Sequence, residues 1–432
     1  MKSLFPLLGL LVGLNPIACS GGSGATGDNS GGSPAGSSAG SHGNPGGAGG
    51  ASGGSTAAGA SGNTSAGTSA MGGGSAAGAS GGGANGAGAA ASAGTGGGGP
   101  VMCPTSAPFD AEAPGVREQC TRKVYVAAGM AVRRIVAFDA AKDFAHQVLD
   151  AQDGKGQDEH QIASVAVGKG VIVATGDSGV LTSTDGETWT AITTLPNRIH
   201  ASRVVFALDR FFVVGSNGTW TSSDAISWTG AQNDELLPGN VKASFTGHVG
   251  AAAAGGGKVV FGGDNSVIRV FDGNNWLDGK VGNFNGWLSN VAFGGDRFVV
   301  TGDACCNAPL PNSEGLSATS TDALAWSNLV TNATPGVSSR RFGALLWAGD
   351  HFYATGTQYG NTGYTSPDGA QWTEVKLDHN IGSAVYYEGE YFGSNGTSLF
   401  TSADGVKWSA VLTGVDSDYS LGALAIGRIL KK

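Results

Sequence analysis

One short motif recurs six times between residues 185 and 408: an aspartate followed four residues later by a tryptophan. Successive aspartates are 39, 48, 50, 46 and 36 residues apart. A period of that size is typical of the four-stranded blades of a β-propeller. We call these segments the Asp–Trp turns, and their end residues are Asp185 and Trp189, Asp224 and Trp228, Asp272 and Trp276, Asp322 and Trp326, Asp368 and Trp372, and Asp404 and Trp408.

The residues around each aspartate explain why the motif makes a tight turn. Glycine follows the aspartate in four copies and accepts a positive φ, while the carboxylate can accept backbone N–H groups across the turn. A serine stands two places before the aspartate in five copies, and Val270 takes that place in the other. The tryptophan is expected to bury its ring in the blade. Ala225 and Ala323 replace the glycine in two copies, and we expect them to distort those turns.

This motif resembles the Asp-box, or BNR repeat, of sialidases and many other propellers, and it extends over the chain after residue 120. In that family the box is a structural device on the face opposite the functional one. The resemblance therefore implies a structural role for the six aspartates and six tryptophans.

Apolar runs of strand length precede each turn, and we name the four strands of a blade a to d. In the second blade, residues 162–167, 171–175 and 180–184 predict strands a, b and c, with d following Trp189. The same scheme recurs in the sixth blade at residues 342–347, 352–355 and 363–365.

The two ends of the propeller region complete one another. Residues 123–128 and 133–138 predict strands b and c of a first blade, followed by a degenerate turn at 139–143 with Phe144 in place of tryptophan. Its strand a is missing, whereas residues 421–427 match a strand a with no blade after it. We expect the C-terminal strand to complete the first blade and to close an all-β propeller of seven four-stranded blades, since closure removes exposed strand edges.

The N-terminus is typical of an exported chain. Residues 1–19 begin with Lys2 and continue with a short apolar run at 4–14, as in a secretory signal peptide. The Ala18–Cys19 pair resembles a bacterial lipobox, although Pro16 stands where an aliphatic residue is usual. We expect Cys19 to carry a lipid anchor, with ordinary cleavage and release as the alternative.

The next segment, residues 20–102, is almost entirely Gly, Ser, Ala, Thr and Asn. Such a composition cannot bury enough apolar surface to offset its ordering entropy, so we expect a disordered linker. Residues 103–432 are then the propeller, held at the cell envelope or outer surface.

Four cysteines remain. Export favours a disulfide between Cys103 and Cys120, which flank a loop before the first strand. The adjacent Cys305 and Cys306 could form a vicinal disulfide, stay as two thiols, or bind metal, and their spacing is poor for metal. We expect no metal and no cofactor.

Candidate ligand-binding residues lie in the b–c and d–a connections, which gather on the face opposite the Asp–Trp turns. Blade five carries a long b–c insert at 303–315, unlike the short turns elsewhere. Polar and aromatic residues there could line a ligand funnel, although they could equally be solvated rim residues. The candidates are His200, Trp287, Arg341, Tyr359, His379 and Tyr419.

The residues favour a monomeric binding module without catalysis, whose partner is a protein or a carbohydrate. A formal charge of −9 argues against nucleic acid, and membrane contact is expected only through the anchor. A sialidase-like glycoside hydrolase is one alternative, but the Arg-Ile-Pro motif of sialidases is here Arg134-Ile135-Val136 on a middle strand. An envelope assembly or maturation factor, similar to the photosystem II stability factors, is the other.

Overall fold

The structure is a computed structural model, and it describes twelve stretches of the chain. Residues 1–100, with the expected signal peptide, Cys19 and nearly all of the linker, lie outside the described residues. The described stretches are 101–129, 135–139, 162–176, 179–195, 201–245, 247–282, 286–304, 315–327, 330–331, 342–356, 361–414 and 421–431.

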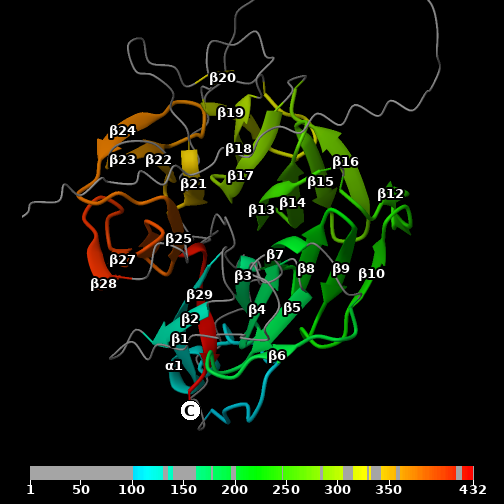
Figure 1. Ribbon diagram of the computed structural model, residues 1–432, viewed down its shortest axis with the longest axis vertical. Coiled ribbons are helices and arrows are strands. Elements are labelled where there is room, and N and C mark those ends of the chain that lie inside the picture. The colour runs from blue at the N-terminus through cyan, green and yellow to red at the C-terminus, as the bar shows by residue number, and fades with distance from the viewer. Residues whose placement is uncertain are drawn as a thin grey trace, which may run out of the picture. The chain divides into compact units, whose positions relative to one another are not determined.

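The described residues form an all-β propeller of antiparallel sheets arranged around a common centre (Figure 1). Six of these sheets have four strands, in chain order a to d from the centre outwards. The strands are β3 Ile162–Gly168, β4 Val171–Gly176, β5 Gly179–Ser183 and β6 Thr190–Ala191 in blade 2; β7 Ala201–Ala207, β8 Arg210–Gly215, β9 Gly218–Ser222 and β10 Thr229–Gln232 in blade 3; β13 Val249–Gly255, β14 Lys258–Gly263, β15 Val267–Phe271 and β16 Trp276–Lys280 in blade 4; β17 Gly286–Gly294, β18 Arg297–Ala304, β19 Gly315–Ser320 and β20 Val330–Thr331 in blade 5; β21 Phe342–Trp347, β22 Phe352–Gly356, β23 Thr362–Ser366 and β24 Thr373–Lys376 in blade 6; and β25 Ser383–Tyr387, β26 Glu390–Ser394, β27 Leu399–Ser402 and β28 Ser409–Leu412 in blade 7.

The remaining sheet of the ring joins the two ends of the propeller region. It has three strands within the described residues, in the order β2 (Ile135–Asp139), β1 (Thr121–Gly129) and β29 (Leu421–Leu430). The expected pairing of the C-terminal strand with β1 is present, and it runs on to Leu430. The expectation of seven four-stranded blades was therefore wrong in number: the described residues form six four-stranded blades and this three-stranded sheet. The expected degenerate turn beyond Asp139 lies outside the described residues.

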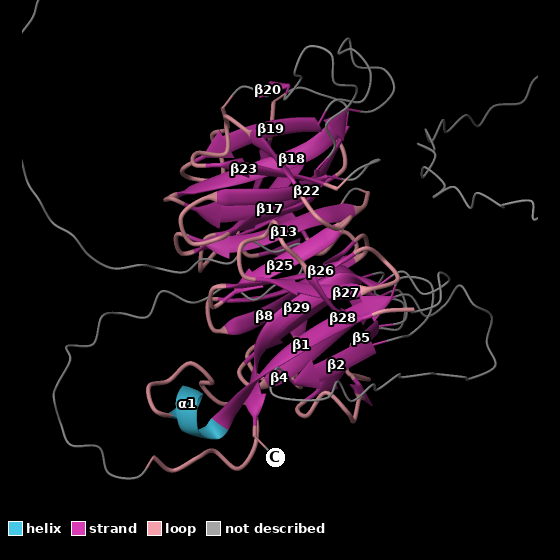
Figure 2. Cartoon of the chain, turned by 90° about the vertical axis from the view of Figure 1, so that its left-hand side faces the viewer, coloured by secondary structure: helices cyan, strands magenta, loops and turns pink. Residues whose placement is uncertain are grey.

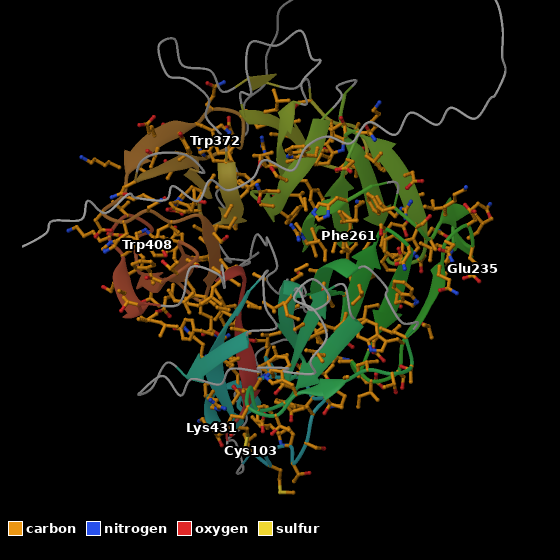
Figure 3. The ribbon with its side chains drawn as sticks, viewed as in Figure 1. Cys103, Glu235, Phe261, Trp372, Trp408 and Lys431 are labelled. Carbon is orange, nitrogen blue, oxygen red and sulfur yellow. A yellow bond between two sulfur atoms is a disulfide. The ribbon has the colours of Figure 1, made fainter. Side chains whose placement is uncertain are left out.

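Apolar side chains between neighbouring sheets hold the ring together. Each neighbouring pair of sheets, including the three-stranded one with both of its neighbours, shares a cluster of buried residues. Between blades 3 and 4, Phe261 lies 6.5 Å from Phe212 and 6.0 Å from Trp276, ring centroid to centroid (Figure 3). Because the inner strands are packed on both faces, their sequences are nearly continuous apolar runs rather than alternating ones.

A short helix and a two-stranded hairpin were not expected from the sequence, whereas one disulfide was. A short helix, α1 (Val116–Cys120), runs directly into β1 (Figure 2). A hairpin of β11 (Leu236–Leu237) and β12 (Val241–Lys242) stands between blades 3 and 4. The expected disulfide between Cys103 and Cys120 is confirmed, with a Cα–Cα distance of 5.3 Å.

Residues 101–120, which we call the N-terminal strap, bind the a–b turns of two blades that are not neighbours. The backbone N–H of Phe109 donates to the carbonyl of Lys169 in blade 2, at 3.0 Å. At the other side, the hydroxyl of Tyr387 in blade 7 donates to a carboxylate oxygen of Glu112, at 2.5 Å. The strap therefore links the two blades that flank the three-stranded sheet. No helix in the described part of the chain has the length and apolar character needed to cross a bilayer.

Candidate ligand-binding face

The connectivity of the blades separates two faces of the ring. Within each antiparallel blade, the a–b and c–d turns lie at one end, which we call the turn face, and the b–c turns and d–a connections lie at the other, the loop face. All six Asp–Trp turns are c–d connections and lie on the turn face.

Each Asp–Trp turn satisfies its own polar groups. In all six, the aspartate Oδ1 accepts the backbone N–H groups two and three residues on, at 2.7–3.0 Å. In five, the preceding serine hydroxyl donates to the same oxygen, at 2.9–3.1 Å. The backbone N–H groups lower the pKa of Asp272, Asp322 and Asp404, because they stabilise the charged carboxylate. These contacts support a structural role for the turns.

Ala225 and Ala323 occupy the glycine position without distorting their turns. Their φ angles are 62° and 64°, close to 79° at Gly186 and 74° at Gly369. The aspartate bonds in both turns are as short as in the others, at 2.7–2.9 Å. The expectation of distorted turns was wrong, because the carboxylate network holds the left-handed conformation against a cost of about 1–2 kcal/mol.

Only two of the six sequence-predicted ligand residues fall within the described chain. His379 packs its ring 5.0 Å from that of Phe400 and places Nδ1 2.9 Å from Oδ1 of Asp378. Asp378 in turn accepts the backbone N–H of Trp408, so His379 belongs to the packing between blades 6 and 7. The other candidate is Trp287, whereas four lie outside the described residues: His200, Arg341, Tyr359 and Tyr419.

Trp287 lies on the loop face in a cluster that the sequence did not predict. It is the second residue of β17, is half-buried, and forms a backbone β-bridge with Asp264 of the blade-4 b–c turn. The carboxylate of Asp264 accepts the backbone N–H of His248 at 2.9 Å, and His248 is exposed in the connection before β13. The structure thus brings an indole, a carboxylate and an imidazole-bearing residue together where blades 4 and 5 meet.

Arg203 extends this cluster towards blade 3. It lies on β7, and its Nε donates to the carbonyl of Gly250 on β13 at 3.0 Å, with a second, shorter bond from Nη2 to the same oxygen. A side chain at Gly250 would collide with the carbonyl of Leu288, the residue after Trp287. The inner strands of blades 3, 4 and 5 therefore meet closely at the level of Arg203 and Trp287. Sequence reasoning missed Arg203 because the candidates were sought in the connections between strands, whereas Arg203 lies within β7. Its charge in an otherwise largely apolar strand was the available signal.

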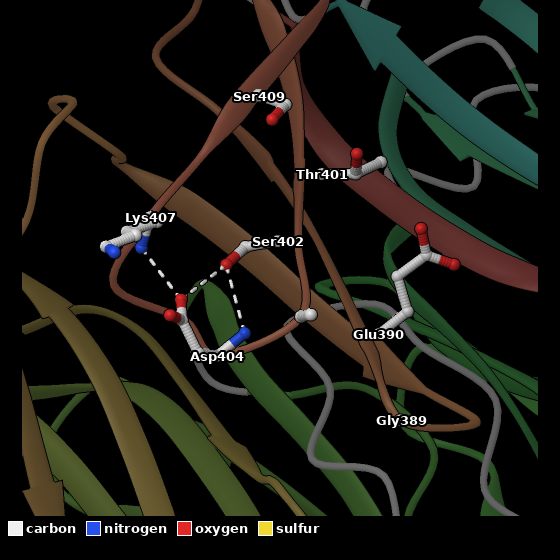
Figure 4. Close-up of a pocket in the computed structure, with 8 residues that line it drawn as sticks. Gly389, Glu390, Thr401, Ser402, Asp404, Lys407 and Ser409 are labelled. Carbon is white, nitrogen blue, oxygen red and sulfur yellow. Dashed lines mark hydrogen bonds between the residues drawn. The ribbon is translucent and has the colours of Figure 1, made fainter.

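A shallow depression on the turn face of blade 7 is a weaker candidate. It has a volume of about 460 Å³ and is lined by polar residues of β26, β27 and the turn after β27 (Figure 4). Its two acidic groups already have partners: Asp404 binds its own turn, and Glu390 accepts from Lys123 at 3.2 Å and from Tyr125. The depression therefore presents no unpaired acid for chemistry.

Cys305, Cys306 and most of the blade-five insert lie outside the described residues. Within the residues that the structure does describe, no three His, Cys, Asp or Glu side chains are grouped so as to hold a metal ion.

The sheets define the chain as a β-propeller. No protein-family model matches it, and no curated protein is similar in sequence. Among solved structures, YCF48 bound to a D1 peptide is 16% identical over 63% of this chain and 85% of that one, with a TM-score of 0.45. Apo AztD from Citrobacter koseri is 11% identical over 71% and 98%, with a TM-score of 0.41. A catalytically inactive virginiamycin B lyase from Staphylococcus aureus with quinupristin is 12% identical over 62% and 91%, with a TM-score of 0.47. Similarity at this level does not extend to ligand or activity.

Proposed function

We propose that this chain is an exported, non-catalytic propeller of the Asp-box type that binds a protein or glycan partner through its loop face. One observation carries the proposal: the two faces differ in how regular they are. The turn face repeats one self-satisfied hydrogen-bonded turn six times. The loop face carries Arg203, His248 and Trp287, which are not repeated from blade to blade in the way that the Asp–Trp turns are. In a repeated fold, polar and aromatic residues that depart from the repeat on the loop-bearing face are candidates for binding.

A pull-down from envelope extract, run beside a glycan array, tests this proposal with two matched variants. Trp287→Ala removes a half-buried indole from the loop face, and Ile226→Ala removes a side chain that is 60% exposed on the turn face. Aromatic anchors often dominate binding, so Trp287→Ala should reduce capture at least tenfold and Ile226→Ala should not. Equal loss from both variants, measured on folded protein, would place the binding surface elsewhere.

The membrane anchor is part of the proposal. Cys19 is proposed to be acylated, with residues 20–102 as a linker that holds the propeller away from the membrane. Cys19→Ser should release the chain from the membrane fraction or block its processing. Recovery of the wild-type chain only as a soluble species without lipid would contradict the anchor.

The blade-five insert is proposed to contribute to the same face, because a loop of that length is more often functional than structural. Replacing residues 304–314 with a Gly-Asn turn should leave the melting temperature nearly unchanged and weaken capture of the partner. Unaltered capture would show that the insert takes no part in binding.

A further inference from the structure

We propose that Arg203 is the anchor of a carboxylate-binding site at the loop-face ends of the inner strands of blades 2, 3 and 4, and that the carboxylate belongs to a peptide segment of the partner. This inference rests on the proposed binding function and names the chemistry that the loop face recognises.

Arg203 lies next to a bulge in the innermost strand of blade 3. The register of β7 against β8 shifts between Ala201 and Arg203, which leaves Ser202 as a bulge in the innermost strand. Bulges re-aim the side chains next to them. Here Nη1 donates to the carbonyl of Ser202 at 2.9 Å and reaches towards the carbonyl of Ala163 on β3, at 3.5 Å. Since Nε and Nη2 bind Gly250 on the other side, the guanidinium spans three neighbouring inner strands.

The positive charge at this position has no counter-ion among the described residues. All its bonds are to neutral main-chain carbonyls, and those four bonds use four of the five N–H donors, which leaves one on Nη2. Burial lowers the pKa of Arg203 to about 10, so the group remains charged at neutral pH. A partly buried cation without an acid is costly, and a bound anion would remove that cost.

The repeat shows that folding does not require an arginine here. Three other blades carry the same bulge in strand a, and the residues after it are Ser164, Ala251 and Asn290. Each of those is buried and small or neutral. Arg203 is the charged exception in this set and is also more exposed than the others.

The chemistry of the site favours a carboxylate on a peptide. A single guanidinium matches one monoanionic carboxylate, whereas a phosphate group usually attracts several cations. The innermost strand is the edge strand of its sheet, but its main-chain groups at Ser202 and Val204 are already bonded to Arg203 and Ser164, so a peptide is expected to be held here by its side chains and its carboxylate. Trp287, close by on blade 5, offers an apolar surface to the peptide side chain next to the bound carboxylate.

The test uses the full chain and a peptide array in three series. The first series ends in a free carboxylate, the second has the same sequences ending in carboxamide, and the third is the carboxamide series with one internal glutamate. Affinities are measured for wild type, Arg203→Gln, Arg203→Lys and the control Arg210→Gln, which makes the same charge change at an exposed residue on the turn face of blade 3.

We expect binding of the free-carboxylate peptides or of the glutamate-containing carboxamides, and no binding of the plain carboxamides. Binding of the first set indicates a chain terminus, and binding of the glutamate set indicates an acidic side chain. Arg203→Gln should lose at least tenfold, Arg203→Lys should lose less, and Arg210→Gln should be unchanged. If Arg203→Gln does not fold, competition against wild type by acetate but not by acetamide supports the site.

Equal binding of all three series, equal binding by folded Arg203→Gln, or acetamide competing as well as acetate would overturn the inference. Binding confined to acidic glycans would also overturn it, because the partner would then not be a peptide. A partner captured equally by Arg203→Gln would refute this inference while leaving the proposed binding function intact.

Discussion

Arg428 and Glu388 form a two-pronged salt bridge, with Nε 2.9 Å from Oε1 and Nη2 2.9 Å from Oε2. Arg428 lies near the end of β29, and Glu388 lies in the a–b turn of blade 7. Arg117 of the N-terminal strap binds the same carboxylate at 2.5 Å. This contact joins the last strand of the chain, the first helix and blade 7, so it closes the ring on the turn face.

Arg428→Ala should lower the free energy of unfolding by about 1–3 kcal/mol, because it leaves a largely buried carboxylate with fewer partners. The two side chains are only 16% and 17% exposed. Lys242→Ala is the control, since Lys242 and Asp234 form a pair that is 65% and 85% exposed. Exposed pairs contribute little, so this control should change stability by less than about 0.5 kcal/mol. If Arg428→Ala and Lys242→Ala had equal effects in denaturant titrations, the Arg428 contact would not stabilise the closed ring.

Low pH should weaken the contact between Arg428 and Glu388. Burial acts to raise the pKa of Glu388, but the hydrogen bonds from Arg428 and the charges of Arg428 and Arg117 outweigh it and lower the pKa below its usual value. A carboxylate with a depressed folded pKa stabilises the protein above its unfolded pKa of about 4.3, and this stability is lost as pH falls through the folded value. Melting temperatures measured from pH 6 to pH 3 should therefore fall more steeply for wild type than for Glu388→Gln. Parallel curves would contradict this assignment.

The tryptophans of the Asp–Trp turns should not be equivalent. Trp408 is 3% exposed and donates its indole N–H to the carbonyl of Gly405, whereas Trp189 is half-buried. Trp408→Ala should cost about 3–5 kcal/mol and Trp189→Ala about 1–3 kcal/mol. Neither should affect partner binding by the folded fraction, as measured beside the denaturant curves. Loss of binding without loss of stability would mean that the turns are functional.

Alanine and glycine should not be interchangeable between the Asp–Trp turns. A Cβ at Gly369 would clash with Val299 of the neighbouring blade, so Gly369→Ala should cost about 1–3 kcal/mol. Ala323 is fully buried with a φ of 64°, so Ala323→Gly relieves strain but loses a buried methyl group, and these effects of about 1 kcal/mol nearly cancel. Thermal melts of the two variants compare the effects directly. A large loss from Ala323→Gly would show that the methyl contact dominates.

The Cys103–Cys120 disulfide should stabilise the strap. The two cysteines are 17 residues apart, and closing a loop of that size contributes about 3 kcal/mol in the chain-entropy description. Replacing both by serine should lower the unfolding free energy by a comparable amount, and dithiothreitol should then have no further effect. A double variant as stable as wild type would mean that the contacts of Phe109 and Glu112 hold the strap without the disulfide.

The sequence alone predicts the repeated parts of this protein, because their interactions are local. The carboxylate of Asp185 accepts backbone N–H groups two and three places away, and the strands 162–167 and 342–347 are nearly continuous apolar runs. The pairing of the C-terminal strand with β1 was also predictable, since an orphan strand a at one end matched a blade without one at the other. The tolerance of Ala225 in its turn was not, because it depends on how the network balances backbone strain.

Only the tertiary structure decided which single residues the ring brings together. Arg203 meets Gly250 across 47 residues of sequence, and Arg428 meets Glu388 across 40. Each partner lies on a different blade, so its position depends on the rotation from one blade to the next and on bulges such as Ser202. Sequence periodicity reports which residues are buried, but it carries no information on which edge atoms of neighbouring blades come within bonding distance. The sequence therefore determined the propeller, and the packing of its blades decided where the candidate site lies.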